Sequence, residues 1–553
     1  MANSQPDLQQ PERAVRVPTM IANGLTAAAM ISAVVLRWFD LGKLSLWWDE
    51  GFTAWASTLS SANIVRFAQT DNQPPLYYLL IHYWQILFGN SEYALRALSA
   101  LFGTLSLPIF YLLAKKVLKD STAVALAVCL FAFSMKQIWY SREARAYEVA
   151  SFFALVALYA LVLFLEKRSL MTFVIIVMSA ATTLYIHNMM AFYVLALNVT
   201  WLIYPSERGW AQRVKELLLA DILAGFLYLP WALTLFTQVA AVKGNLSWVP
   251  RPTFWTVVGT LWDIAGFEMS YLFAVASKLV PFPMRMGWLF LVGGASLLCA
   301  ALLAGGVWRV PKADRNRDLA LLLYCLLPIV AVFVLSQKIL PLYIDRVFTA
   351  SSVVVPIVFA YPLALQRGQK GRALYGFLGI VLAATTALSA FGFLRYREGK
   401  GKNNEDWRGA TSSLVRIQET NRLIVFVPPA GEMLFDYYRR KFPADGLEVS
   451  IISLPVSFYD QFPPPKSKPI GASEIDRLKL ALESKNYSEV DLVLAHEVDP
   501  QGLTLDFLDR TFGQQEGEEN YGTTVKIVRF LALSHESSDS RDVRHGVEIE
   551  VRR

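Results

Sequence analysis

Cysteine, histidine and charged residues are all scarce in this sequence. Its 553 residues include three cysteines and five histidines, and only 18% of them are charged. Cys129, Cys299 and Cys325 all lie inside apolar segments, so no disulfide framework is predicted. The histidines are spread along the chain without an HxxxH or His/Cys cluster, which argues against a dedicated zinc site. Since a soluble chain would carry about 25% charged residues, the composition excludes an ordinary soluble protein.

Long apolar segments take the place of the missing charge. Hydrophobic residues make up 54% of the chain, and residues 20–39 form a nearly uncharged segment of the ~20 residues that cross ~30 Å of hydrocarbon. Similar segments recur as far as about residue 394. They predict an α-helical polytopic membrane protein. The first segment is expected to be an uncleaved anchor, because no small-residue cleavage site follows it.

The net charge of +7 comes from Lys and Arg residues that gather in short segments between the apolar ones. Such clusters are typical of cytoplasmic loops under the positive-inside rule. The basic balance therefore reflects membrane topology and does not predict a nucleic-acid partner. The clusters are Lys115-Lys116, Lys167-Arg168 and residues 208–215, 309–317 and 367–372.

The N-terminal tail, residues 1–19, is expected to be cytoplasmic. If the loops that follow lie alternately outside and inside the membrane, the chain crosses it eleven times within residues 20–394. Residues 75–89 are expected to form an interfacial helix on the outer surface. The number of crossings changes if residues 75–89 or the apolar region 254–283 also cross the bilayer. The predicted crossings are residues 20–39, 93–114, 122–139, 148–165, 171–187, 189–204, 216–237, 285–307, 318–336, 346–366 and 372–394.

The composition changes abruptly after residue 394. Residues 395–408 read as a polar linker that contains glycine, and residues 409–553 alternate candidate strands with candidate helices. This alternation predicts a small extracytoplasmic α/β domain with a partly parallel sheet. The expected strands are residues 423–427, 447–452, 490–495 and 524–533, and the expected helices are residues 407–418, 431–441 and 473–485.

The predicted topology brings a set of polar residues to the outer rim of the membrane. Asp49 and Glu50 follow the first crossing, and mutual repulsion of adjacent carboxylates in a partly dehydrated site is expected to raise the pKa of at least one. Such an Asp suits a base that acts on an alcohol or amine. Ionisable groups at this depth are costly unless paired, so structural salt bridges are the alternative interpretation. The rest of the set is Gln73, Arg142, Arg145, Tyr147, His187, Lys338, Tyr343 and Arg346.

The arginines of this set indicate a phosphate ligand. The guanidinium groups of Arg145 and Arg346 would hold a phosphate bidentately, better than an ammonium group would. A base beside a phosphate clamp at a membrane surface indicates transfer of a group from a lipid phosphate. Well-placed donors would stabilise the leaving phosphate by ~3–4 kcal/mol each. No metal site is predicted, although a divalent cation on Asp49, Glu50 and the donor phosphate stays open.

Four sequence elements carry a family resemblance. They are Trp48-Asp49-Glu50, the QPPLYY segment that starts at Gln73, the REARAY segment at residues 142–147, and Arg346 before a late helix. In this order they resemble the glycosyltransferase C superfamily over about residues 20–395. The branch with the closest resemblance is the family-39-like one, which includes protein O-mannosyltransferases and lipid A aminoarabinose transferases. Gln73 departs from the pattern, because relatives often have His or Lys before the two prolines.

The resemblance implies an inverting glycosyltransferase that moves a sugar from a polyprenyl-phosphate donor to a hydroxyl of a lipid, glycan or protein. It implies a bacterial plasma membrane, an outer-face active site and no cofactor. Asp49 would be the general base, and Glu50 would orient it. Arg346, Arg145 and Lys338 would bind the donor phosphate, and the expected substrate contacts are Gln73, Arg142, Tyr147, His187 and Tyr343.

A transporter or flippase of lipid-linked sugars is the alternative function. Proteins of that class are expected to have inverted repeats, broken helices and charged residues near the middle of the bilayer. In this sequence the charges gather at one rim, and no repeat is evident.

Overall fold

A computed structural model describes residues 19–531 of the chain, with several gaps. The chain divides into two units, residues 1–404 and 405–553, and each is described by itself. The predicted N-terminal tail and the predicted crossing at residues 285–307 lie outside the described residues, as does most of the predicted linker. The gaps are residues 72, 246–248, 267–293, 295–311, 367–368, 397–404, 418–420, 443–448, 464–469, 486, 497–498, 500 and 513–514.

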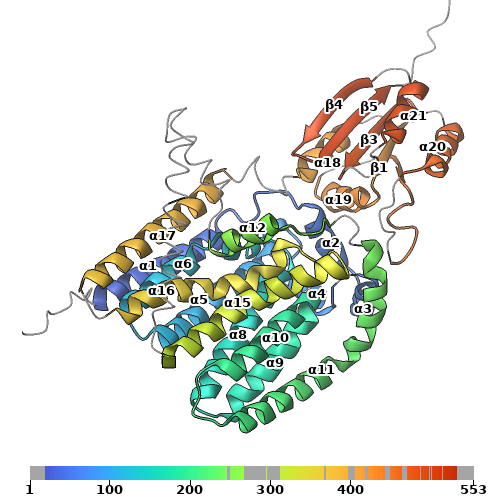
Figure 1. Cartoon of the computed structure of the whole chain (residues 1–553). Helices are drawn as coiled ribbons and strands as arrows, with labels where there is room; N and C mark the ends of the chain where they lie inside the picture. The colour runs from blue at the N-terminus through green and yellow to red at the C-terminus, as the bar shows by residue number, and fades with distance from the viewer. Residues whose placement is uncertain are drawn as a thin grey trace, which may run out of the picture. The chain divides into compact units, whose positions relative to one another are not determined.

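In the described residues of the first unit, all regular secondary structure is helical (Figure 1). Two short helices that the sequence did not predict, α2 and α3, follow the first long one. The elements are α1 (Thr19–Trp38), α2 (Trp48–Ser57), α3 (Ser61–Thr70), α4 (Leu76–Phe88), α5 (Glu92–Leu118), α6 (Ser121–Ala132), α7 (Met135–Tyr140), α8 (Ala146–Glu166), α9 (Leu170–Ile186), the 3-10 helix η1 (Asn188–Met190), α10 (Ala191–Ile203), α11 (Trp210–Asn245), α12 (Phe254–Ile264), α15 (Lys312–Lys338), the 3-10 helix η2 (Asp345–Val353), α16 (Val355–Leu365) and α17 (Gln369–Tyr396).

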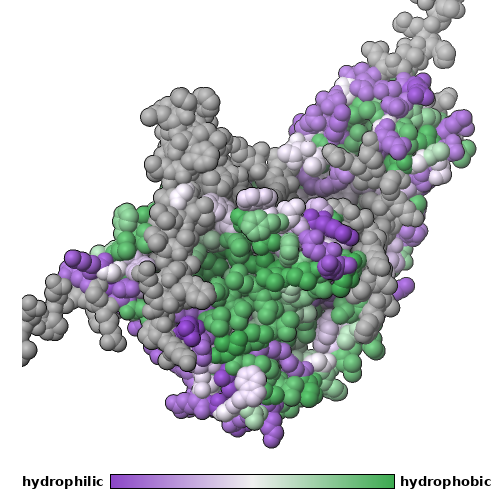
Figure 2. Space-filling view, in the orientation of Figure 1, coloured by the Kyte–Doolittle hydropathy of each residue, from purple (hydrophilic) through white to green (hydrophobic). Residues whose placement is uncertain are grey.

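Seven helices of the described residues are long and apolar enough to cross a membrane, and three shorter helices are also apolar. Figure 2 shows a broad hydrophobic surface on one face of this unit, with hydrophilic residues toward its ends. A surface of this kind is stable against lipid and unfavourable in water. The predicted class of a multi-pass helical membrane protein is therefore confirmed, whereas the predicted number of eleven crossings is not.

One predicted crossing, residues 122–139, is interrupted. Helix α6 ends at Ala132, and α7 starts at Met135 after an extended Ser134 (φ −60°, ψ 114°). The break allows the buried Gln137 side chain to reach η2, where its Nε2 donates to the Thr349 carbonyl (3.0 Å) and the Ser352 hydroxyl (2.9 Å). A buried amide without such partners would destabilise the fold. The prediction of one continuous crossing was wrong because the apolar pattern does not reveal this contact.

The second unit is an α/β domain built on a five-stranded sheet of order β2-β1-β3-β5-β4. Strands β2, β1 and β3 are parallel, while β5 and β4 pair antiparallel, which confirms the predicted partly parallel sheet. The sequence did not predict α21 or β4. The elements are α18 (Trp407–Arg416), β1 (Arg422–Val427), α19 (Ala430–Arg439), β2 (Ser450–Ser453), α20 (Ala472–Ser484), β3 (Glu489–Ala495), α21 (Leu503–Phe512), β4 (Gln515–Tyr521) and β5 (Val525–Leu531).

Candidate active site

Asp49 lies in the first turn of α2 and faces two arginines. Its Oδ2 accepts a hydrogen bond from Arg346 Nη1 at 2.7 Å and lies 3.8 Å from Arg145 Nη2. The side chains of Asp49 and Arg346 are 22% and 20% exposed, whereas that of Arg145 is 8% exposed. The carboxylate is thus held at the open edge of a mostly buried pair of guanidinium groups.

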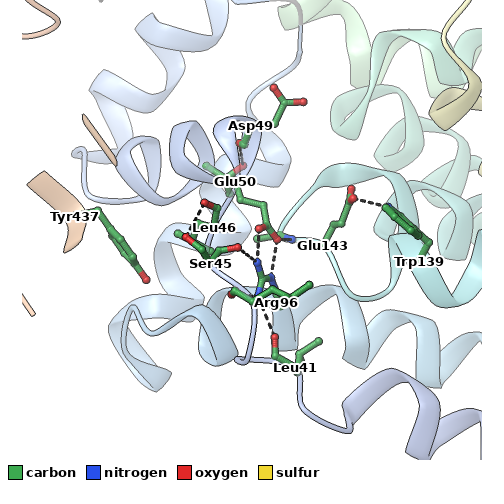
Figure 3. A network of polar contacts seen from close by, with 12 residues as sticks. Leu41, Ser45, Leu46, Asp49, Glu50, Arg96, Trp139, Glu143 and Tyr437 are labelled. Atoms are coloured by element: carbon green, nitrogen blue, oxygen red, sulfur yellow. Dashed lines mark hydrogen bonds and ion pairs between the residues drawn. The ribbon is translucent and has the colours of Figure 1, made fainter. Parts of the chain in front are cut away.

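Glu50 points away from Asp49 and into the protein, as Figure 3 shows. Its buried carboxylate receives two hydrogen bonds from Arg96, one from Nε (2.8 Å) and one from Nη2 (2.5 Å). The remaining N–H groups of Arg96 donate to the carbonyl oxygens of Leu41, Leu44 and Ser45. All five N–H donors of this guanidinium therefore have an acceptor.

The arrangement of the Asp49 and Glu50 carboxylates is determined by their arginine partners and not by repulsion between them. Each carboxylate has its own arginine, because successive residues on a helix point in directions about 100° apart. Asp49 faces Arg346 and Arg145, and Glu50 faces Arg96. Of the two carboxylates, Glu50 is part of the framework, and Asp49 is the one at the open edge.

The loop between α7 and α8 is fixed to α2 and α5 through its backbone. The Ala144 N–H donates to Glu50 Oε1 at 2.8 Å, and Ser99 Oγ of α5 donates to the Arg145 carbonyl at 3.2 Å. Arg145 Nη1 donates to the Asp49 carbonyl (3.2 Å) and to Thr53 Oγ1 (3.3 Å). These contacts orient the Arg145 side chain toward the start of α2.

Helix η2 carries Arg346 and is held from several sides. It packs against α7, α8, α12 and α15. Asp345, the neighbour of Arg346, forms an ion pair with the buried Lys136 of α7 (Nζ to Oδ2, 3.6 Å). Together with the Gln137 hydrogen bonds, this ion pair fixes the backbone from which Arg346 extends.

Tyr147 lies beside both guanidinium groups. The guanidinium carbons of Arg145 and Arg346 are 6.0 Å and 5.6 Å from the centre of its ring, a distance at which cation–π attraction applies. The Nε atoms of both arginines are buried and have no hydrogen-bond partner among the described residues. A buried donor left without an acceptor costs about 1–3 kcal/mol, so an anion that reached these donors would complete the site.

His187 supplies a neutral imidazole next to Tyr147. The two ring centres are 5.5 Å apart, and Nδ1 accepts a hydrogen bond from the Met189 backbone N–H at 3.2 Å. Burial, followed by the charges of Arg145 and Arg346, lowers the pKa of His187 to about 3. The ring is therefore uncharged near neutral pH, and because Nδ1 accepts a hydrogen bond, its proton lies on Nε2.

Glu143 is a carboxyl group that the sequence did not single out. It is 7% exposed, and its Oε1 accepts a hydrogen bond from Trp139 Nε1 at 2.5 Å (Figure 3). Burial, followed by the nearby Glu50 charge, raises the pKa of Glu143 to about 8. At neutral pH this group is mostly protonated, so it adds little negative charge beside Asp49.

Two other predicted site residues, Arg142 and Tyr343, form hydrogen bonds within the protein. Arg142 is buried and donates to the carbonyl oxygens at the end of α1, those of Leu36 (2.7 Å) and Arg37 (3.1 Å), which is a structural contact. The Tyr343 hydroxyl donates to Thr260 Oγ1 of α12 at 2.9 Å.

Gln73 and Lys338 differ in their accessibility. Gln73 is buried, and its Oε1 has no hydrogen-bond partner within the described part of the chain. Lys338 is exposed at the end of α15.

A metal ligand set is not evident where the structure describes the chain. No group of three or more His, Cys, Asp or Glu side chains is close enough there to hold an ion. Asp49 faces two cations, and both oxygens of Glu50 accept from Arg96. This donor set fits an anion better than a divalent cation, which prefers several free carboxylate oxygens.

The sequence interpretation missed Arg96, the main partner of Glu50. A usable signal was present, because Arg96 lies inside the predicted crossing at residues 93–114, and a charge at such a position needs a partner. Gln137 and Lys136, also missed, lie in the predicted crossing at residues 122–139. Pairing of these residues with specific partners depends on the fold.

Comparison with known proteins agrees with the resemblance seen in the sequence. Residues 72–233 match the family model described as dolichyl-phosphate-mannose-protein mannosyltransferase. This segment contains Arg145, Tyr147 and His187 but neither Asp49 nor Arg346. The predicted resemblance is confirmed over these residues by this family match. No curated protein sequence matches the chain.

Solved structures of limited similarity include AglB, ArnT and AftD. The oligosaccharyltransferase AglB from Archaeoglobus fulgidus is 14% identical (85% of this chain, 69% of that chain, TM-score 0.47). ArnT from Cupriavidus metallidurans, solved with undecaprenyl phosphate, is 13% identical (93% and 98%, TM-score 0.42). The arabinofuranosyltransferase AftD from Mycobacteria is 14% identical (94% and 42%, TM-score 0.45).

Replacing Glu50 by Gln tests the framework role of this residue. The change keeps the shape but leaves the buried Arg96 charge without its counter-ion, which costs about 3–5 kcal/mol. We expect a marked fall in the melting temperature of the full-length protein in detergent. The control is Glu166→Gln, which removes the ion pair of Glu166 with Lys116, both 38% exposed, and which should change stability by less than about 1 kcal/mol. Equal melting temperatures for the two variants would contradict the framework role.

The raised pKa of Glu143 predicts a pH-dependent stability. Because the folded-state pKa of about 8 lies above the ordinary value of 4.5, the folded state binds the proton more tightly than the unfolded state does. This contribution is complete below pH 4.5 and is lost as the pH rises toward 8. The Glu143→Gln variant cannot lose a proton, so its melting temperature should fall less than that of the wild type over this interval. Parallel curves for the two proteins would show that Glu143 titrates normally.

Proposed function

We propose that this protein is an inverting glycosyltransferase that transfers a sugar from a polyprenyl-phosphate donor to an acceptor hydroxyl. The observation that carries this proposal is the position of Asp49 at the open edge of the Arg145–Arg346 pair. A base beside two cations suits a reaction in which an alcohol is activated next to a phosphate leaving group. The glycosyltransferase family match over residues 72–233 supports the same reaction class.

The arginine pair would bind the donor phosphate. Two guanidinium groups within reach of one carboxylate give the cluster a net positive charge, and each has a buried Nε donor without a partner among the described residues. Guanidinium donors match phosphate oxygens in geometry and in charge. Tyr147 keeps both groups on one side of the site by its ring contacts.

The reaction would be a single displacement. The acceptor oxygen attacks the anomeric carbon of the sugar from the face opposite the phosphate, and its proton passes to Asp49. The bond between the anomeric carbon and the phosphate oxygen breaks, and its electron pair stays on that oxygen. The products are a glycoside of inverted configuration and a polyprenyl phosphate, whose charge Arg145 and Arg346 stabilise.

The surrounding residues would take supporting roles. The Arg96–Glu50 pair fixes the start of α2 and the Ala144 backbone, so we assign Glu50 to positioning. The neutral His187 ring would donate a hydrogen bond from Nε2 to a sugar or phosphate oxygen. No metal is required by this scheme, since the arginines provide the positive charge.

The predicted topology also assigns the site to one side of the membrane. The site would face the outer side of a bacterial plasma membrane, where the lipid-linked donor and an acceptor lipid, glycan or protein meet. The α/β domain at residues 405–553 would lie on that same side of the membrane. Basic residues such as Lys115 and Lys116, in the last turn of α5, support this orientation because such residues are typical of the cytoplasmic side.

Replacing Asp49 by Asn tests the proposed base. Loss of a general base is expected to lower the transfer rate on the order of 10²–10⁴-fold, and loss of the anion that balances Arg145 and Arg346 is also expected to lower the melting temperature. Release of polyprenyl phosphate from a lipid extract that contains polyprenyl-phosphate sugars, measured by mass spectrometry, would report the rate.

The matched control is Asp40→Asn, which changes an aspartate that pairs with Lys43 at 3.9 Å and is 44% exposed. This variant should transfer sugar at the wild-type rate. Retained turnover in the Asp49→Asn variant would refute the assignment of Asp49 as the base.

A further inference from the structure

Arg346 has one hydrogen bond to an anion and one buried donor without an acceptor. Its Nη1 donates to Asp49 at 2.7 Å, and its Nε is buried without a hydrogen-bond partner in the described part of the chain. The side chain as a whole is 20% exposed. A phosphate that approaches from the open edge therefore meets the terminal nitrogens first, and one of these is already bound to Asp49.

The charges around this pair leave Asp49 as the anion that balances it. Glu50 is bound to Arg96, Asp345 is paired with Lys136, and Glu143 is mostly protonated at neutral pH. Asp49 therefore occupies the position that a ligand anion would take between Arg145 and Arg346.

We propose that Asp49 and the phosphate of the lipid donor compete for Arg346, so that donor binding is the event that releases Asp49 to act as a base. The inference rests on the proposed function and adds an order of events to it. Asp49 Oδ2 lies 2.7 Å from Arg346 Nη1 and 3.8 Å from Arg145 Nη2, so a phosphate that bridged the two guanidinium groups would take the place of this carboxylate.

The competition has a chemical consequence for the acceptor. A carboxylate that accepts a hydrogen bond from a guanidinium attracts a proton less strongly than a free one. Before the donor arrives, Asp49 is held by Arg346 and cannot activate a hydroxyl group. After the donor arrives, the phosphate takes over the guanidinium, and the freed Asp49 faces the acceptor. The enzyme is thereby protected from activating water or acceptor when no sugar is present.

The competition predicts that a variant without catalytic activity binds the lipid phosphate more tightly. The Asp49→Asn change removes the competing anion and keeps the side-chain shape. We expect the full-length variant in lipid nanodiscs to bind undecaprenyl phosphate about tenfold more tightly than the wild type, which corresponds to about 1.4 kcal/mol. Asp40→Asn serves as the control and should bind like the wild type, and undecaprenol without phosphate measures the contribution of the chain.

A double-mutant cycle distinguishes competition for Arg346 from general repulsion between Asp49 and the phosphate. In an Arg346→Gln background, Asp49→Asn should no longer raise the affinity for undecaprenyl phosphate if the two anions compete for this guanidinium. A gain that persists in that background overturns the proposal, and so does an Asp49→Asn variant that binds as the wild type does or more weakly.

The failure of the proposed function would look different. If the wild type and all variants bound undecaprenyl phosphate no better than undecaprenol, the phosphate site itself would be absent, and the inference would fall with it. If the wild type bound undecaprenyl phosphate but Asp49→Asn did not raise the affinity, the phosphate site would be supported, and only the proposed competition would be wrong.

Discussion

The ion pair between Glu50 and Arg96 is the interaction on which the site depends. It joins the start of α2 to α5, and the same arginine binds the carbonyl oxygens of the segment between α1 and α2. The Ala144 N–H bound to Glu50 adds the loop that carries Arg145. With Glu50 fixed on the inner side of α2, the helical rotation of about 100° per residue turns Asp49 toward the open edge. Two adjacent carboxylates thus take separate tasks because each meets a different arginine.

The site is built from segments that are far apart in the sequence. The hydrogen bond between Asp49 and Arg346 joins residues that are 297 positions apart, and it requires α2, η2 and the loop before α8 to meet. Buried polar contacts such as those of Gln137 and Lys136 hold η2 in place, because a charged residue on a loosely held segment would not keep its direction. The open edge is left to Asp49 and Arg346, the two groups that the proposed donor and acceptor would reach.

Much of the helical architecture could be predicted from the sequence, because the lengths of the apolar segments mark the helices. Topology alone also brought Asp49, Arg145, Tyr147, His187 and Arg346 to one face, and the structure places them together. The sequence could not predict which carboxylate would be buried, because this depends on Arg96. It also missed β4, whose seven residues, Gln515–Tyr521, are polar and mostly exposed at the edge of the sheet and show no apolar alternation. The break at Ser134 was missed because its neighbours Phe133 and Met135 are apolar, although Lys136 and Gln137 follow directly.

The central claim is that a sugar leaves a polyprenyl phosphate at the Asp49 site. The most direct measurement is mass spectrometry of the lipid-linked sugars and the envelope glycans of cells from which the gene has been deleted, with the wild-type gene restored as the comparison. The account predicts that one polyprenyl-phosphate sugar accumulates and that one lipid, glycan or protein loses the same sugar. Unchanged levels of both donor and acceptor after deletion would contradict it.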